Sequence, residues 1–359
     1  TQQETLFPYT TLFRSGFGAG QGGQTSSRAG GGGGLGAGGA IFVDADGTAT
    51  LTNCTLSANS ATGGAGGDAS GGMGGEGGDG LGGAIFARGD LTLLHTTVAF
   101  NEVDAGAAGT GGSPSAGAAE GMGVYITDNS GAKPSVEFTN SILSDGVDGT
   151  SGSASDVSFN GSVGASGNIT VSGDGNIIIS QDPASTVTVI TTNADPQLLA
   201  LADNGGFSQT HRVDTTAPSP AIDAGTVLTT PPTSDQRGFP RVAASTASGT
   251  DLPDVGAFEF QLNEIPTITS PTATLATNRR IEFLTGTSTE LSLLDDSGQN
   301  AIELDLLVSG GRLSLASMTG LTFLTGDGTN DPQITVTGSL ADLNRALDGL
   351  VFEHTTTSA

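Results

Sequence analysis

The segment Gly38-Gly39-Ala40-Ile41-Phe42-Val43 recurs along the chain, and this repetition limits the fold more than any other feature. It returns twice, as residues 82–87 and, more loosely, as residues 121–126. We align Ala40 with Ala84 and Val124, which gives spacings of 84 − 40 = 44 and 124 − 84 = 40 residues. A period of this length is typical of stacked supersecondary units, each too thin to bury its own apolar face.

A second apolar segment follows each copy, at residues 51–56, 93–98 and 138–143. Its first and last apolar residues are five apart, so a strand with alternating side chains cannot bury both. A turn must change the alternation, and asparagine suits this turn because it tolerates the left-handed backbone conformation. We therefore expect two polar ladders, formed by Asn53, His95 and Asn140 and by Asn59 and Asn101. His95 is interpreted as a stacked polar substitute, with a metal ligand as the alternative.

Glycine-rich runs separate the apolar segments, at residues 16–39, 63–82 and 105–121. The chain has 59 glycines among 359 residues, where average usage gives about 25. Insertions can leave a parallel β-helix at one turn without disturbing the neighbouring coils. The sequence predicts an all-β protein, with a right-handed parallel β-helix over residues 16–262 and the three glycine-rich loops forming a mobile flank.

Residues 195–259 consist of short turn motifs, among them Leu201-Ala202-Asp203-Asn204-Gly205-Gly206, Asp235-Gln236-Arg237-Gly238-Phe239-Pro240-Arg241 and Asp254-Val255-Gly256-Ala257-Phe258-Glu259. These motifs resemble the choice-of-anchor Q domain, a family of bacterial cell-surface β-helix proteins with varied C-terminal anchoring devices. The resemblance implies an exported protein, secreted or displayed on the cell surface.

The charged residues of these motifs have a physical interpretation of their own. Turns rich in glycine and proline can fix a carboxylate–guanidinium pair, which we expect to cap the open end of the β-helix as a structural clasp. Catalysis at the same cluster is the alternative. The residues assigned to the clasp are Asp223, Asp235, Arg237, Arg241, Asp254 and Glu259.

Residues 263–359 show the strand alternation of a β-sandwich, interrupted by one helix. Ser339 is the expected N-cap of this helix, Leu340, Leu343 and Leu347 its buried stripe, and Gly349 its end. The run from Val308 to Leu315, with Gly326-Asp327-Gly328 and residues 338–344, resembles the cadherin-like or Ig-like repeats of bacterial adhesins.

Both ends of the chain suggest a piece of a longer gene. Residues 5–15 resemble the translation of a sequencing adapter, so we set residues 1–15 apart from the fold; a genuine edge strand is the alternative. At the other end we expect the last strand of the sandwich to be missing.

Two groups of residues are candidates for binding or chemistry. Asp44, Arg88 and Asp128 are expected in one column of the stack, as a surface charge ladder or, alternatively, as the sugar-acid site of a polysaccharide lyase or glycoside hydrolase. No cofactor other than calcium is expected. The candidate calcium ligands, which ordinary turns explain equally well, are Asp295, Asp296, Asp327 and Asp331.

Composition narrows the range of partners. A formal net charge of −26 repels nucleic acids and anionic membranes, and no apolar run is long enough to span a bilayer. The single cysteine, Cys54, is expected to be a small core residue. We expect a monomeric, non-enzymatic adhesion protein that binds surface glycans or other cells.

Overall fold

The chain forms two compact units in the computed structural model, residues 1–260 and residues 261–359. The structure describes residues 4–6, 10–11, 20–26, 29–128, 133–150, 152, 154–163, 168–182, 190–241, 252–261, 266–269, 271, 280–295 and 301–355. The fold is all-β, with one helix among these residues.

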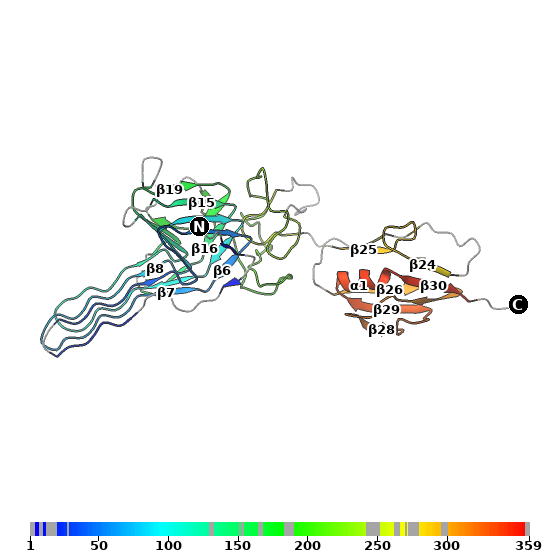
Figure 1. Ribbon diagram of the computed structural model, residues 1–359, viewed down its shortest axis with the longest axis horizontal. Coiled ribbons are helices and arrows are strands. Elements are labelled where there is room, and N and C mark those ends of the chain that lie inside the picture. The colour runs from blue at the N-terminus through cyan, green and yellow to red at the C-terminus, as the bar shows by residue number, and fades with distance from the viewer. Residues whose placement is uncertain are drawn as a thin grey trace. The chain divides into compact units, whose positions relative to one another are not determined.

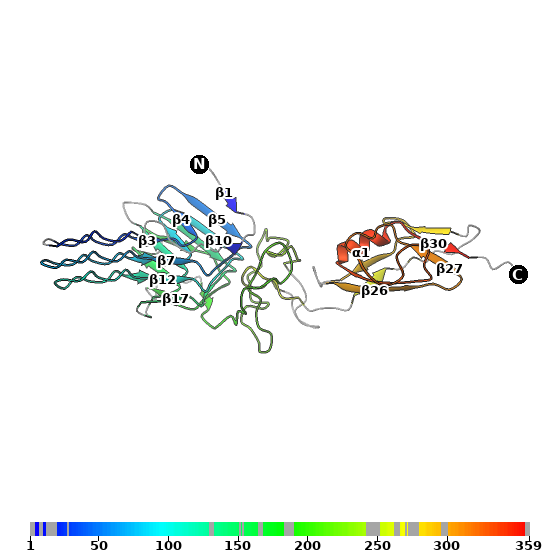
Figure 2. The same ribbon diagram turned by 90° about the horizontal axis from the view of Figure 1, so that it is seen from below.

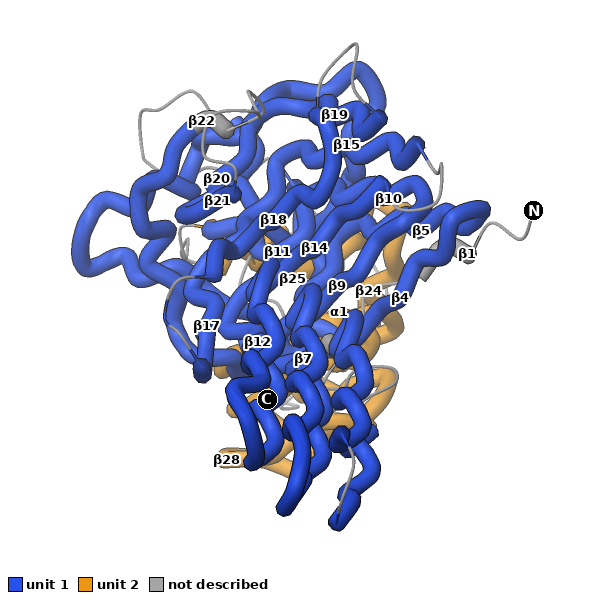
Figure 3. Tube along the Cα trace, turned by 90° about the vertical axis from the view of Figure 1, so that its left-hand side faces the viewer, with its two compact units in different colours: residues 1–260 blue, residues 261–359 orange. Residues whose placement is uncertain are grey.

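Three parallel sheets make up the body of unit 1 (Figures 1 and 3). The β5 sheet contains, in order, β1 (Glu4–Leu6), β5 (Thr48–Thr52), β10 (Asp90–Leu94), β15 (Ser135–Thr139) and β19 (Thr170–Ser172). The β6 sheet contains β2 (Thr10–Thr11), β6 (Thr55–Ser57), β11 (Thr97–Ala99), β16 (Ile142–Ser144), β20 (Asn176–Ile178) and β22 (Ile190–Thr192). The β9 sheet contains β4 (Ile41–Val43), β9 (Ile85–Ala87), β14 (Val124–Thr127), β18 (Val157–Asn160) and β21 (Gln181–Asp182).

Two smaller parallel sheets lead into and out of the glycine-rich runs. One contains β7 (Ser60–Thr62), β12 (Glu102–Asp104) and β17 (Val147–Asp148), and the other contains β3 (Gly36–Ala37), β8 (Gly80–Leu81) and β13 (Ala119–Glu120). In all five sheets, neighbouring strands come from successive repeats of the sequence. Each repeat is therefore one coil of a stack of parallel sheets, which is compatible with a β-helix-like fold.

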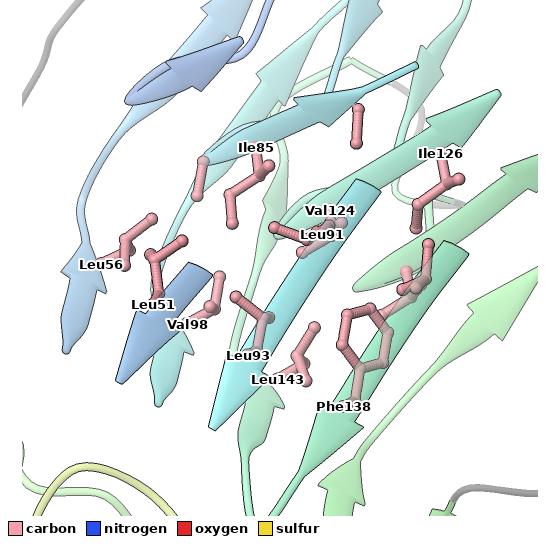
Figure 4. Close-up of a cluster of buried hydrophobic side chains, with 14 of the residues drawn as sticks. Leu51, Leu56, Ile85, Leu91, Leu93, Val98, Val124, Ile126, Phe138 and Leu143 are labelled. Carbon is pink, nitrogen blue, oxygen red and sulfur yellow. The ribbon is translucent and has the colours of Figure 1, made fainter. Parts of the chain in front are cut away.

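Apolar side chains from the three main sheets point into the stack and form one core. Leu91 and Leu93 of β10, Val98 of β11 and Ile85 of β9 meet there, each at most 1% exposed (Figure 4). Cys54 is buried in the same core, as expected. The recurring apolar segments thus fill the space that no single coil could close.

The turn between β5 and β6 has the left-handed conformation that the spacing of the apolar residues required. Asn53, His95 and Asn140 have φ angles of 53°, 46° and 48°. They separate inward-pointing Leu51 from inward-pointing Leu56, and the same holds in the next two coils. The predicted change in alternation is therefore confirmed.

The glycines that open each repeat have distinct roles. Gly38, Gly82 and Gly121 have φ angles of 61°, 69° and 65°, which favour glycine. The next glycine is required by close contact, because a β-carbon on Gly39 would lie 2.0 Å from the carbonyl oxygen of Gly83.

The third repeat is shifted by one residue from its expected alignment. Val124 lies opposite Ile85, whereas the sequence analysis aligned it with Ala84. The spacing between these coils is therefore 124 − 85 = 39 residues. The glycine-rich run between these two coils, residues 105–121, is shorter than the preceding run, residues 63–82, so the spacing between coils is not constant.

Four residues of the adapter-like segment, 5–6 and 10–11, are also part of the stack. β1 pairs with β5, and β2 pairs with β6, both in parallel. These strands extend two of the main sheets by one coil. The backbone of these four residues is that of the edge-strand alternative, and the rest of the segment lies outside the described residues.

Unit 2 is built from antiparallel sheets and one helix. Its sheets are β23 (Thr267–Thr269) with β25 (Ser292–Leu294), β24 (Arg280–Phe283) with β30 (Leu350–His354) and β27 (Gly311–Ser314), and β26 (Ile302–Leu307) with β29 (Gln333–Gly338) and β28 (Thr322–Thr325). The helix, α1 (Leu340–Leu347), is the predicted one: Ser339 caps its N-terminus, Leu343 and Leu347 are buried, and Gly349 follows its end with a φ of 100°.

Candidate functional site

The three glycine-rich runs form a projection of unit 1 that we call the fin, comprising residues 20–26 with 29–38, 63–82 and 105–121. Each run leaves the stack and returns to it, so that three hairpins lie side by side (Figures 1 and 2). Hydrogen bonds join the hairpins, as from Gly33 N to Glu76 O at 2.8 Å and from Gly66 N to Ala107 O at 2.8 Å. The structure therefore replaces the expected mobile loops with a continuous hydrogen-bonded layer.

Hydrogen bonds within the fin follow a period of three residues. Gly63 donates to Asp104 of the next hairpin, while its neighbour Gly64 donates to Gly34 of the preceding one. Three residues further on, Gly66 and Gly67 repeat this pattern. A β-strand has a period of two, whereas a polyproline II-like helix of glycine has a period of three. The hydrogen bonding of the fin strands therefore follows the polyproline II-like period.

Many glycines inside the fin have no room for a side chain. A β-carbon on Gly33 would lie 1.8 Å from Gly64 O, and one on Gly64 would lie 1.9 Å from Gly20 O. By contrast, a β-carbon on Gly32 would lie 3.8 Å from Glu76 O, an ordinary contact. Glycine is thus required at positions that face a neighbouring hairpin, such as Gly33 and Gly64, and not at Gly32. The fin was not predicted from the sequence, although glycines spaced by three, as at Gly30, Gly33 and Gly36, give its signal.

The strands that leave the stack form the outgoing layer of the fin, and the strands that return to it form the returning layer. The outward-facing residues differ between these two layers. The outgoing layer carries Gln24, Asp68 and Thr110 in one row near its distal end. A depression of about 380 Å³ lies there. It is lined by Gln24, Thr25, Ser26, Asp68, Ser70 and Thr110.

A second polar cavity, of about 300 Å³, lies at the base of the fin. Glu120 and Asp182 line it among alanine, serine and threonine residues. Burial, with Asp182 and Asp79 nearby, raises the pKa of Glu120. The two carboxylates form no recognisable acid–base constellation with a third group.

The segment assigned to the clasp covers the side of the stack and not its open end. Gly256 N donates to Asn140 O at 2.8 Å, Ala257 N donates to Thr97 Oγ1 at 3.0 Å, and Thr55 Oγ1 donates to Gln236 Oε1 at 2.6 Å. These contacts reach three successive strands of the β6 sheet. A second apolar cluster fills the interface and includes Ile142, Ile177, Val213, Ala221 and Val255. The expectation that the clasp caps the end is therefore wrong.

Arg241 connects the clasp to the first ladder. Its side chain is 1% exposed; Nη2 donates to Asn53 Oδ1 at 2.6 Å, and Nη1 lies 3.5 Å from Glu259 Oε2. Glu259 Oε2 also accepts from Asp254 N at 2.9 Å. Burial and the neighbouring Asp254 raise the pKa of Glu259, and burial likewise raises the pKa of Asp254. The clasp therefore holds one guanidinium between two carboxyl groups that resist ionisation.

Arg237 and Asp235 form the second buried pair of the clasp. Arg237 Nε donates to Asp235 Oδ2 at 2.7 Å, and the guanidinium lies between the rings of Phe239 and Phe258 at 4.4 Å and 3.8 Å. Asp235 also accepts from three backbone N–H groups. Asp223 N donates to Asp254 Oδ1 at 2.8 Å, so all six predicted clasp residues belong to one network. The two stacking phenylalanines were not anticipated.

Of the ladder residues, His95, Asn140, Asn59 and Asn101 are buried, and Asn53 is partly buried. Asn140 Nδ2 lies 3.1 Å from His95 Nε2, and Asn101 Oδ1 accepts from Asn59 Nδ2 at 2.9 Å. Burial and the nearby Arg241 lower the pKa of His95 to about 3. The imidazole is therefore neutral and serves as a ladder member. Among the described residues, no three His, Cys, Asp or Glu side chains are grouped to hold a metal ion.

The expected column of Asp44, Arg88 and Asp128 forms only in part. Arg88 Nη1 lies 3.2 Å from Asp44 Oδ1 at the surface. The shifted third repeat places Thr127 opposite Arg88, since Ile126 pairs with Ala87. Asp128 instead accepts from Asn168 Nδ2 at 2.8 Å. A paired-carboxylate site is not assembled by these residues.

The calcium candidates take part in turns of unit 2. Asp331 Oδ2 accepts from the backbone N–H groups of Asp327, Gly328 and Thr329 at 2.9, 2.8 and 3.2 Å. Asp327 Oδ1 accepts from Thr329 N at 2.9 Å. Asp295 lies just after β25, and Asp296 lies outside the described residues. The Asp327–Asp331 segment thus has the hydrogen bonding of an ordinary aspartate turn.

Comparisons with protein-family models, with curated proteins and with solved structures found no match. In the described part of the chain, no helix has the length and apolar character that crossing a membrane requires.

Proposed function

We propose that this protein is an exported bacterial cell-surface protein that adheres to glycans or to other cells and performs no catalysis. Unit 1 is, in this proposal, a right-handed parallel β-helix with a choice-of-anchor Q clasp, and unit 2 is a cadherin-like or Ig-like adhesin repeat. The motifs at residues 201–206, 235–241 and 254–259 support the first assignment. The antiparallel sheets of unit 2 support the second.

The fin is the observation that carries this proposal. Ordering a residue costs roughly 1–2 kcal/mol of backbone entropy, and glycine loses the most freedom. The interior glycines bury no side chains, so hydrogen bonds alone must offset that cost. Beyond its base, where Ala37 and Leu81 pack against Phe86 and Tyr125, the fin extends the surface of unit 1. A surface for contact explains such a projection better than a role in folding.

The disposition of charge supports adhesion over catalysis. The buried arginines described in unit 1, Arg237 and Arg241, belong to the clasp, where carboxyl and backbone groups satisfy them. Outside the clasp, the ion pair found among the described residues of unit 1 is Asp44 with Arg88, in which the Asp44 side chain is 73% exposed. An exposed pair in water stabilises charge weakly and is poorly placed to activate a glycosidic bond.

The test measures binding and depolymerisation together. Beads coated with the purified chain are incubated with bacterial cells and with a panel of neutral and acidic polysaccharides. We expect saturable retention without release of reducing ends or unsaturated sugar acids. Asp44→Ala and Asp46→Ala serve as a matched pair at neighbouring exposed positions. Depolymerisation that Asp44→Ala abolishes and Asp46→Ala leaves intact would establish the lyase or glycosidase alternative.

Export is tested separately by immunolabelling intact cells that produce the protein. We expect label on the surface without permeabilisation. Label that requires permeabilised cells would contradict the proposed location.

A further inference from the structure

We propose that the distal depression of the fin is a binding site for neutral glycans. The proposal rests on the adhesive function above and deepens it by assigning a place and a ligand class. The site lies on the outgoing layer, where the polar side chains of neighbouring hairpins come into one row.

Hydrogen bonds hold the side chains of this site in place before any ligand arrives. Asp68 Oδ1 accepts from Thr110 N at 2.7 Å and from Thr110 Oγ1 at 2.8 Å. Gln24 Nε2 donates to Asp68 Oδ2 at 3.4 Å, and Ser70 Oγ donates to Ser26 O at 3.3 Å. Such preorganisation lowers the entropic cost of binding. The bonds made by Asp68 Oδ2 and Ser70 Oγ are long, so both atoms can also bind a ligand hydroxyl.

The fin backbone explains why this place is rigid enough for recognition. Thr25 pairs with Ala69 in parallel, and Ala69 N donates to Thr110 O at 2.8 Å. The three hairpins are therefore in register up to the depression. Adjacent extended strands lie about 4.8 Å apart, which gives a regular row of amide, carboxylate and hydroxyl groups.

The chemistry of the lining selects the class of ligand. The described lining residues comprise four with hydroxyl groups, one amide and one carboxylate, without a basic or large apolar side chain. The carboxylate of Asp68 repels phosphate, sulfate and uronic acids. The polar lining provides no apolar surface for a lipid or an aromatic ligand. A neutral sugar, whose hydroxyls both donate and accept, matches the groups that remain.

The lower edge of the fin offers a useful contrast. Glu76 is an exposed residue of the returning layer, and Ser115 is exposed beside it. Neither residue lines the distal depression. Substitutions there change the same fin without entering the proposed site, so they provide matched controls.

The experiment uses the full chain with soluble dextran, mannan, cellohexaose and chitohexaose as neutral probes and with alginate, hyaluronan and polygalacturonate as acidic probes. Binding is measured by calorimetry for wild type, Ser70→Tyr and Gln24→Ala. Ser70→Tyr fills the depression and should reduce affinity for a neutral probe at least tenfold. Gln24→Ala removes one donor and should reduce it about five- to tenfold.

Ser115→Tyr and Glu76→Gln should bind within twofold of wild type. Hydrogen exchange of the fin amides in every variant shows whether the fin is still folded. A selective loss of neutral-probe binding in Ser70→Tyr, with protected fin amides, supports the site.

Several results overturn the inference in distinguishable ways. Neutral-probe binding that Ser70→Tyr and Gln24→Ala leave unchanged would reject the site and preserve the adhesive function. If only acidic probes bind, or if cells bind and no glycan probe does, the ligand class would be rejected and the adhesive function preserved. Failure to bind any probe or cell would remove both proposals.

Discussion

The coil stack and the fin belong to the same three repeats, yet they hold neighbouring strands together in opposite ways. In the stack, side chains such as Leu93 and Phe138 fill the space between sheets. In the fin, the strands approach so closely that a β-carbon at Gly64 would overlap a neighbouring carbonyl oxygen. One region is stabilised by what its side chains bury, and the other requires that side chains be absent.

This difference implies different stabilities. Apolar burial stabilises the stack by roughly 25 cal/mol per Å², and it couples the coils into one core. Each hydrogen bond of the fin contributes a net of roughly 1 kcal/mol, against a large loss of glycine entropy. The fin should therefore open locally without unfolding the stack.

A core substitution has the largest expected effect. Phe138→Ala removes a fully buried ring and should lower the free energy of unfolding of unit 1 by about 3–5 kcal/mol. Urea denaturation followed by circular dichroism measures the change. Phe207→Ala is the control, because Phe207 is 99% exposed. Equal stabilities for the two variants would show that the stack does not depend on its core.

A fin substitution should act only on the fin. Gly64 N donates to Gly34 O, and Gly78 N donates to Gly64 O. Gly64→Ala displaces both bonds, and two bonds of roughly 1 kcal/mol each correspond to about a 30-fold loss of exchange protection. Hydrogen exchange with mass spectrometry should show this loss in fin peptides and unchanged protection in the stack.

Gly32→Ala is the matched control, since its β-carbon meets only Glu76 O at 3.8 Å. Protection of the fin in this variant should equal that of wild type. If Gly64→Ala also exposed the peptides of β10, the stack and the fin would be one cooperative unit.

The sequence determines the stack more visibly than the fin because side-chain patterns record burial. Five-residue spacings within each apolar segment predicted the left-handed turn at Asn53, His95 and Asn140, and Ser339 and Leu343 predicted α1. Glycine gives no such pattern, since it suits both loops and close-packed strands. Only the three-residue period of the glycines distinguishes close-packed strands from loops.

The clasp was predictable as a set of residues but not as a position. Asp235 and Arg237 could be paired from their spacing in a tight turn. Their placement over the β6 sheet depends on contacts such as Gln236 with Thr55, which are 181 residues apart. The misplacement of Asp128 has a similar cause, because one residue of spacing moves a side chain out of its column.

The clasp should make the stability of unit 1 decrease as the pH rises. The folded-state pKa of Glu259 is raised to about 9 and that of Asp254 to about 7, both chiefly by burial. Raised carboxyl pKa values stabilise the folded state fully at low pH, and this contribution is lost as the pH rises through the folded values. The melting temperature of unit 1 should therefore fall as the pH rises from about 4, near the unfolded pKa values, to about 9.

Glu259→Gln should flatten this dependence, since the amide cannot ionise. Glu102→Gln, at an exposed position of β12, should retain the wild-type profile. Differential scanning calorimetry at half-unit steps of pH provides the comparison. A profile for Glu259→Gln as steep as that of wild type would assign the dependence to other groups.

The surface pair should matter little. Asp44→Ala breaks the exposed ion pair with Arg88 and should cost about 0.2–1 kcal/mol in urea denaturation. Asp46→Ala, two residues away and also exposed, should cost less. A loss above about 2 kcal/mol for Asp44→Ala would indicate that this pair is part of a larger network.

The smallest expected effect is that of a chelator on unit 2. Three backbone N–H groups donate to Asp331 Oδ2, so the turn at residues 327–331 satisfies this carboxylate without a cation. We expect the melting temperature of the full chain to agree within about 1 °C with excess EDTA and with added Ca²⁺, because a ligand stabilises only a state that binds it. Asp331→Ala should destabilise unit 2 equally in both solutions, since it removes the turn itself. A chelator-dependent decrease that Asp331→Ala eliminates would instead establish calcium binding at this turn.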